Sequence, residues 1–136
     1  MQEFRKERHS VSRLMVHLVC VTKYRRKVFD DAAIAWLQTH CAKVCATMGA
    51  QLVALDGESD HMHLLIEYPP KLSVSVLVNA LKGTSSRLLR KDRPDIAARY
   101  WQGVLWSPSY FVVSAGGAPL EKIKEYVEAQ RASSTP

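Results

Sequence analysis

The sequence predicts an α+β domain in which strands and helices follow the order βαββαβ, with one further helix at the end. Three observations predict it: short runs of aliphatic residues typical of strands, two longer stretches with apolar residues at helical spacing, and glycine or proline at the junctions. The chain has 136 residues, 47% hydrophobic and 24% charged, so we expect a single globular domain over residues 1–136. The tail at 132–136 is small and polar and is expected to fray.

The first helix follows a long predicted strand. Residues 12–22 alternate β-branched and apolar side chains, as in a strand that buries one face. Asp30 or Asp31 can cap the helix, because a short acidic side chain accepts hydrogen bonds from the free N–H groups of the first turn. Apolar residues recur at helical spacing to about Met48, and Gly49 then ends the helix.

A hairpin of two strands comes next. Residues 51–56 and 61–68 are both rich in aliphatic side chains, and residues 57–60 between them are typical of a turn. Pro69 and Pro70 end the second strand, because proline cannot donate a hydrogen bond to a strand ladder.

The remaining elements complete a known plan. Ser73 can cap a helix to about Arg90, residues 91–109 are expected to be irregular, and 110–115 form a short strand. A last helix is predicted at 119–131, starting at a proline. This order is that of a ferredoxin-like antiparallel sheet with both main helices on one face, which leaves the C-terminal helix to cover the other.

Composition and cysteine usage point to an intracellular protein. No apolar run reaches the roughly 18 residues that a membrane span requires, so we expect no contact with a membrane. Residues 1–10 are charged and lack the apolar segment of a secretory signal. Three cysteines without such a signal do not suggest disulfides. The expected compartment is the prokaryotic cytoplasm, with action at the nucleoid.

Positive charge is concentrated in two segments. The net charge of +6 divides into +6 for residues 1–27, −4 for 28–81 and +4 for 82–101. Cations interleaved with an aromatic ring suit a nucleic acid, because each cation neutralises a phosphate and the ring stacks on a base. A solvated loop on a basic protein is the alternative. The densest run consists of Lys23, Tyr24, Arg25, Arg26 and Lys27.

Two histidines stand out in the strand predicted at 61–68. His61 and His63 are two residues apart, so they share one strand face while the aliphatic residues between and after them face the core. Two imidazoles on one face can chelate an ion, and Glu58, Asp60 and Glu67 nearby favour a cation. A polar, solvated strand face is the alternative.

The cysteines offer a different metal chemistry. Cys41 and Cys45 could complete a zinc site with the histidines. They lie, however, on the apolar stripe of the first helix, and packing in the core explains them better.

The last predicted helix carries a second pair of polar residues. Tyr126 and Gln130 are one turn apart and share a face, whereas Glu128 is among the charged residues that fall elsewhere. A tyrosine packed against the sheet is one interpretation. In the other, a glutamine oxygen and a tyrosine hydroxyl bring one ligand and one nucleophile to the same ion.

H-M-H on a strand followed by Y-V-E-A-Q on a C-terminal helix resembles the His-hydrophobe-His (HUH) single-tyrosine transposases of small insertion sequences. The resemblance covers nearly the whole chain, in the order found in that family. The stretches that carry it are V-H-L-V-C-V-T-K-Y-R-R-K-V-F at 16–29, D-H-M-H-L-L-I at 60–66, L-K-G-T-S-S-R at 81–87 and L-W-S-P-S-Y-F at 105–111.

The resemblance implies a chemistry for these residues. His61, His63 and Gln130 would hold one divalent ion, Mg²⁺ or Mn²⁺, and Tyr126 would be the nucleophile. Its hydroxyl would attack a phosphodiester and give a 5′-phosphotyrosine and a free 3′-hydroxyl. A later 3′-hydroxyl would attack that linkage and rejoin the DNA, so no nucleotide cofactor is required.

The resemblance also implies partners. The family acts on single-stranded DNA and recognises hairpins near the ends of its elements. Its enzymes are homodimers, and the tyrosine helix can serve the histidines of the partner chain. The two basic segments are our candidates for backbone contacts, with Tyr24, Trp101 and Trp106 as candidates for stacking on bases and Trp36 assigned to the core. In the second segment the candidates are Arg87, Arg90 and Lys91.

Other functions remain open at this point. A domesticated relative that processes repeated palindromes would use the same residues. A rolling-circle replication initiator commonly has a lysine where this chain has Gln130. A non-catalytic single-strand nucleic-acid-binding module would expose aromatic rings on its central strands, where this chain has histidines. A small zinc-binding protein would depend on Cys41.

Overall fold

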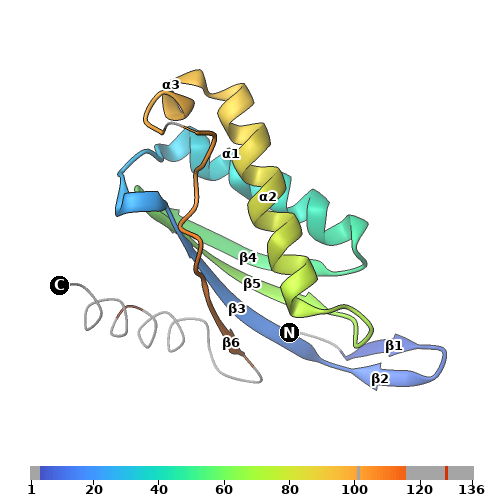
Figure 1. Cartoon of the computed structure of the whole chain (residues 1–136). Helices are drawn as coiled ribbons and strands as arrows, with labels where there is room; N and C mark the ends of the chain where they lie inside the picture. The colour runs from blue at the N-terminus through green and yellow to red at the C-terminus, as the bar shows by residue number, and fades with distance from the viewer. Residues whose placement is uncertain (1–3, 101, 116–127, 129–136) are drawn as a thin grey trace.

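The computed structural model describes residues 4–100, 102–115 and 128, which form an α+β fold (Figure 1). Its four-stranded antiparallel sheet has the spatial order β4-β5-β3-β6. The two central strands are β3 and β5, which are the first and third strands of the βαββαβ plan, as in a ferredoxin-like fold. This confirms the fold class that the sequence predicts. The strands are β3 (Leu14–Val21), β4 (Gln51–Glu58), β5 (His61–Tyr68) and β6 (Phe111–Ser114).

Two long helices, α1 (Asp31–Thr47) and α2 (Val74–Asp92), lie on the same face of the sheet (Figure 1). Both begin at the caps expected from the sequence. The Asp30 carboxylate accepts a hydrogen bond from the Ala33 N–H at 2.8 Å, and the Ser73 hydroxyl accepts one from Val76 at 3.5 Å. Each cap satisfies an N–H group that has no partner within the first turn.

The main core lies between the helices and the sheet. Alternate residues of β5 point into it, so Met62, Leu64 and Ile66 are fully buried. They pack in one cluster with strand residues such as Leu18 and helix residues such as Leu37. Met62, Leu64 and Ile66 of β5 therefore face the core, as the sequence predicts.

The face of the sheet away from α1 and α2 carries a second, smaller core. Met15, Val19, Leu65 and Ala115 form it, with Phe111 among the residues packed against it. His61 and His63 lie on this face. The residues of the expected C-terminal cover lie outside the described residues, Glu128 excepted.

The N-terminal segment differs from expectation. It forms a hairpin of β1 (Arg5–Glu7) and β2 (Ser10–Ser12), and the long first strand begins at Leu14 rather than Ser12. Arg5 anchors the hairpin through two hydrogen bonds from its guanidinium to the carboxylate of Glu67 on β5. Strands of three residues are too short to show a hydrophobic period, so the sequence pattern could not reveal them.

Several other boundaries also move. β4 continues through Glu58 and leaves only Ser59 and Asp60 as the turn. α2 runs to Asp92, and a short helix α3 (Pro94–Ala97) occupies part of the segment that we expected to be irregular. Proline at the first position of α3 suits a helix start.

Of the tryptophans, Trp106 is placed differently from expectation, whereas Trp36 packs against the core as expected. Trp106, a candidate for base stacking, is only 6% exposed; it packs against Phe29 and donates from its indole Nε1 to Ser85. The assignment of Trp106 to base stacking is wrong, because its ring is buried in the core. Trp36 is half-buried at the edge of the core, where its Nε1 donates to Asp92 at 2.8 Å. No helix in the described part of the chain is long and apolar enough to cross a membrane.

Candidate functional site

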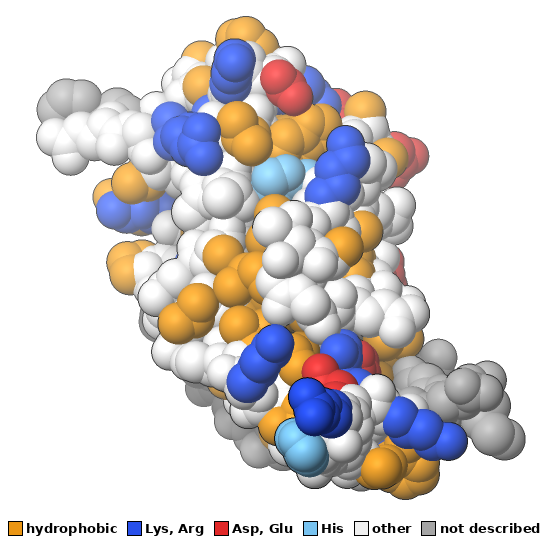
Figure 2. Space-filling view, turned by 90° about the vertical axis from the view of Figure 1, so that its right-hand side faces the viewer, with side chains coloured by type: hydrophobic (Ala, Val, Ile, Leu, Met, Phe, Trp, Pro, Cys, Tyr) orange, Lys and Arg blue, Asp and Glu red, His pale blue; other side chains and the backbone are white. Residues whose placement is uncertain are grey.

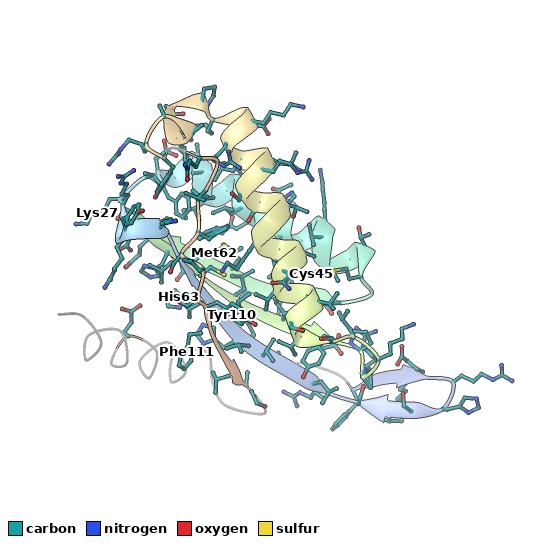
Figure 3. All side chains as sticks on the ribbon, in the orientation of Figure 1. Lys27, Cys45, Met62, His63, Tyr110 and Phe111 are labelled. Carbon is teal, nitrogen blue, oxygen red and sulfur yellow. The ribbon has the colours of Figure 1, made fainter. Side chains whose placement is uncertain are left out.

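The histidine pair lies on the central strand β5, on the face that α1 and α2 leave uncovered. Figure 3 shows His63 on this side, near Phe111, and Met62 on the helix side. His61 pairs with Val21 and Glu58 across the sheet, and His63 with Val19 and Asp56. The shared face predicted from their spacing is confirmed.

The burial of His61 and His63 excludes a solvated strand face, one of the two interpretations of the sequence. His61 is 1% exposed and His63 is 5% exposed, so they do not form a solvated strand face. The two rings meet edge to face with centroids 4.7 Å apart, and the ring of His17 lies 5.4 Å from that of His63. Buried imidazoles need polar or metal partners to offset the loss of hydration.

One carboxylate oxygen lies against both histidines. Oε1 of Glu128 is 3.5 Å from Nε2 of His61 and 3.2 Å from Nε2 of His63. Among the described residues these three side chains offer ligand atoms that all lie within 4.8 Å of one another. Two imidazole nitrogens and one carboxylate oxygen are a donor set for a divalent transition metal.

Asp60 orients the first histidine. Its Oδ1 lies 2.7 Å from Nδ1 of His61. Because an ionised carboxylate can only accept, Nδ1 carries the proton, and the lone pair of Nε2 points toward Glu128 and Glu58. A carboxylate behind a histidine is the usual device that fixes the tautomer of a metal ligand.

A cavity of about 240 Å³ opens beside His63, lined also by Asp56, Gly57, Glu58 and Glu128. Its lining holds three carboxylates, which favours a cation. Gly57 also lets α1 pack closely on β4, because a Cβ there would lie 2.6 Å from the Ile34 side chain. Of the acidic residues expected near the histidines, Glu58 and Asp60 lie against His61, whereas Glu67 pairs with Arg5.

The basic segment at residues 23–27 is tied to the turn that precedes His61. The Thr22 N–H donates to the Asp60 carbonyl at 2.9 Å, and the Val28 and Phe29 N–H groups both donate to the Ser59 carbonyl. Arg25 forms an ion pair with Asp60 at 3.6 Å. The segment therefore lies directly next to the histidine site, which the sequence alone did not show.

This basic segment has an unusual backbone. It contains the 3₁₀ turn η1 (Lys23–Arg25), in which Tyr24 and Arg25 have positive φ angles of 61° and 53°. Non-glycine residues in the left-handed region are strained, and such strain is concentrated at functional sites. Tyr24 is 71% exposed, with Lys23 and Arg26 near its ring.

The second basic segment lies at the end of α2. Arg87 and Lys91 are exposed, whereas Arg90 is half-buried and donates to Ser86. Figure 2 shows Lys and Arg at the upper and lower ends of this side of the molecule, with hydrophobic and neutral side chains between them. The upper group is at the height of the end of α2 in Figure 1.

The stretches 81–87 and 105–111, both part of the family-like pattern, are joined by hydrogen bonds. The Lys82 ammonium donates to the carbonyls of Ser107 and Pro108 at 2.8 and 3.2 Å, and Trp106 donates to Ser85 at 2.9 Å. These bonds hold the segment that leads into β6. Side chains of α2 thus tether the chain just before β6, and β6 itself pairs with β3 along the sheet.

The cysteines belong to the core. Cys41 and Cys45 are fully buried on α1, and burial raises the pKa of the Cys45 thiol to about 11 and that of Cys41 further. A buried, protonated thiol is a poor zinc ligand. The core interpretation is supported, and zinc binding by these thiols is disfavoured.

The other half of the expected site is only partly described. Tyr126 and Gln130 lie outside the described residues, so their approach to the histidines stays a prediction. Glu128, which lies between them in the sequence, is the residue that the structure brings to the histidines. Sequence reasoning missed it because its place on the helix pointed away from the tyrosine face.

Residues 10–130 match the family of transposases described as IS200-like. The ISDra2 transposase TnpA of Deinococcus radiodurans is 30% identical over 128 residues, which are 94% of this chain and 91% of that protein. The transposase for insertion sequence element IS200 of Salmonella typhimurium is 32% identical over 114 residues, 84% of this chain and 74% of that protein.

Solved structures show the same likeness. A crystal structure from Deinococcus radiodurans R1, of a protein assigned as a transposase, superposes with a TM-score of 0.79 at 34% identity and covers 93% of this chain and 97% of that one. A REP-associated tyrosine transposase bound to a REP hairpin superposes with a TM-score of 0.57 at 15% identity, covering 94% and 69%. The second likeness is one of fold.

Proposed function

The chain belongs to the family of IS200-like transposases, and from that premise we propose that it cleaves and rejoins single-stranded DNA at the ends of an insertion sequence. One observation carries the proposal: two buried imidazole Nε2 atoms converge on one point beside an acidic cavity. The sequence likeness to transposases of insertion sequences favours this function over a domesticated palindrome nuclease. Its test is a metal-dependent covalent adduct between the protein and single-stranded DNA from the flanks of the gene.

The residues present fit a divalent ion. Nε2 of each histidine faces the Glu128 carboxylate, Asp60 fixes the tautomer of His61, and the cavity is acidic. We propose His61, His63 and Gln130 as the ligands during cleavage, with Mg²⁺ or Mn²⁺ as the ion, since nitrogen and oxygen ligands suit Mn²⁺ and tolerate Mg²⁺. When bound, the ion supplies Lewis-acid stabilisation of charge at the scissile phosphate.

Tyr126 is the proposed nucleophile. Its oxygen forms a bond to phosphorus while the bond from phosphorus to the 3′-oxygen breaks. The phenolic proton passes to solvent, and the leaving 3′-oxygen takes a proton from solvent to become the 3′-hydroxyl. The products are a 5′-phosphotyrosine and a free 3′-hydroxyl. Attack by a later 3′-hydroxyl reverses these bonds and joins a new strand, so the chemistry needs no nucleotide cofactor.

We further propose that the protein binds DNA hairpins through its basic segments. Residues 23–27 support this, because they combine exposed cations with an exposed tyrosine next to the histidine site. Replacing Arg25 and Lys27 with alanine is expected to weaken binding to a hairpin oligonucleotide from the gene's flank. Fluorescence anisotropy across a salt series should show the slope of log K against log salt falling by about 0.7 per lost contact to a single strand.

The control for that experiment is Lys71→Ala, an exposed lysine in the acidic middle of the chain. It should leave both the affinity and the slope unchanged. An unchanged slope in the Arg25, Lys27 double variant would mean that these cations do not contact phosphates. Equal affinity of the wild type for the hairpin and for a scrambled single strand would remove hairpin recognition from the proposal.

Asp60 is a positioning residue in this account. Replacing it with alanine frees the imidazole of His61 to rotate and to change tautomer, and is expected to weaken Mn²⁺ binding by about 10- to 100-fold. Asp60→Asn keeps an oxygen acceptor and should restore part of the affinity. Isothermal titration calorimetry measures both, with Asp31→Ala, an exposed acidic residue of α1, as the charge-matched control. Equal Mn²⁺ affinity in Asp60→Ala and wild type would contradict the role.

The active unit is proposed to be a homodimer with composite sites. A chain with His61→Ala and His63→Ala is mixed with a Tyr126→Phe chain, neither of which can cleave alone. Recovered cleavage in the mixture is expected if the tyrosine helix of one chain serves the histidines of the other. Inactivity in heterodimers verified by two affinity tags would show that each site is built within one chain.

The remaining expectations fit this function. The family match over 10–130 supports treating residues 1–136 as one transposase domain. We propose action in the cytoplasm at the nucleoid, where the DNA substrate lies.

A further inference from the structure

The carboxylate of Glu128 stands where a ligand to the proposed ion would stand, although the proposed function assigns that place to Gln130. We propose that Glu128 is the third metal ligand of a resting state, in which the nucleophile is turned away from the site. This inference rests on the proposed function and adds a second state to the same metal site.

The distances around Glu128 suit a shared ion. Two ligand atoms that each lie about 2.1 Å from one octahedral or tetrahedral ion are about 3.0–3.4 Å apart. Oε1 of Glu128 is 3.2 Å from Nε2 of His63 and 3.5 Å from Nε2 of His61. All three ligand atoms lie within 4.8 Å of one another, so side-chain movements that shorten these distances would bring them onto one ion.

The surrounding charges favour a cation at this point. Oε2 of Glu58 lies 3.5 Å from the same His61 nitrogen, and Asp56 also lines the cavity. Three carboxylates next to two imidazoles repel one another unless positive charge lies between them. A divalent ion held by His61, His63 and Glu128 would supply that charge.

Helix geometry makes this state incompatible with cleavage. Glu128 is in helical conformation, and successive residues of an α-helix are turned by about 100°. Residues two positions away are thus turned by about 200°, onto the opposite face. On the helix that the sequence predicts, Tyr126 and Gln130 share the face opposite Glu128, so one orientation cannot present both faces to the histidines.

The exchange of ligands has an electrostatic consequence. A carboxylate ligand brings a negative charge that opposes the approach of a DNA phosphate, whereas the amide of Gln130 is neutral. Binding of DNA should therefore favour release of Glu128 from the ion, and release of Glu128 should favour binding of DNA. The resting state holds the ion, protects the histidines and keeps Tyr126 from the metal until DNA arrives.

Mn²⁺ affinity in the absence of DNA tests the proposal. Free Mn²⁺ is measured by electron paramagnetic resonance in titrations of the full chain as wild type, Glu128→Ala, Gln130→Ala and the control Glu121→Ala, a glutamate on the same predicted helix. Alanine keeps helix propensity, and thermal melts verify folding. Glu128→Ala is expected to weaken binding at least about tenfold, while Gln130→Ala and Glu121→Ala stay within about twofold of wild type.

Two results would overturn the proposal. One is a Glu128→Ala affinity equal to that of Glu121→Ala. The other is a Gln130→Ala loss as large as that of Glu128→Ala, since Gln130 would then already be the resting ligand. The affinities decide this even if wild type forms no DNA adduct, in which case it is the proposed function that fails.

The rate of adduct formation gives a second readout. At saturating Mn²⁺, Glu128→Ala is expected to form the DNA adduct several-fold faster than wild type, because the competing orientation is lost. A slower rate would mean that Glu128 helps cleavage, and the resting role would be wrong.

Discussion

Replacing both His61 and His63 with alanine is expected to abolish metal-dependent DNA cleavage and to weaken Mn²⁺ binding by more than about 100-fold. The two Nε2 atoms converge beside an acidic cavity, and no other described group of His, Cys, Asp and Glu side chains brings three ligand atoms together there. The measurement is a Mn²⁺ titration followed by a cleavage assay on a hairpin oligonucleotide.

The control for this pair is His40→Ala. His40 is half-buried on α1, on the other side of the sheet from His61 and His63, with its Nε2 2.8 Å from the Thr84 hydroxyl. Since both substituted sites are at least partly buried, circular dichroism melts must show that each variant folds. A folded double variant with wild-type Mn²⁺ affinity would contradict the assignment of the metal site.

Tyr126→Phe is expected to reduce cleavage by about 10³-fold or more and to leave no covalent adduct. The substitution removes only a hydroxyl, so charge is unchanged and hairpin binding should stay within about twofold of wild type. Denaturing gels measure the adduct, and anisotropy measures binding on the same preparations.

Tyr24→Phe is the matched control, because Tyr24 is an exposed tyrosine on the basic segment next to the histidines. It should still form the adduct, with at most a modest loss of DNA affinity. An adduct that persists in Tyr126→Phe and is lost in Tyr24→Phe would mean that Tyr24, and not Tyr126, is the nucleophile.

The sheet and its main helices could be predicted from the sequence because each has a clear local signal. The period of two in β5 separates His61 and His63 from Met62, Leu64 and Ile66, and the structure confirms that separation. Asp30 and Ser73 mark helix starts through side-chain chemistry that acts within one turn.

Features that depend on tertiary contacts could not be predicted. The burial of the histidines depends on what covers their face, and Trp106 is core only because Ser85 and Phe29 lie beside it. The link between Arg25 and Asp60 joins residues 35 positions apart, which no periodicity reveals. Glu128 was missed because a helix can rotate about its axis without any change in its pattern.

The site therefore has two kinds of support. His61, His63, Asp60 and Glu128 are placed by the structure, whereas Tyr126 and Gln130 are assigned by their likeness to the family motif. An experiment that joins the two halves is the most informative.

That experiment is a map of the covalent adduct. Single-stranded oligonucleotides from both flanks of the gene, top and bottom strand, are incubated with the protein and Mn²⁺ or Mg²⁺, and adducts are digested and sequenced by mass spectrometry. We predict a metal-dependent adduct on one strand only, with the DNA 5′-phosphate on Tyr126. An adduct on another residue, or hairpin binding without an adduct on any strand, would contradict the assignment of this chain as an active single-tyrosine transposase.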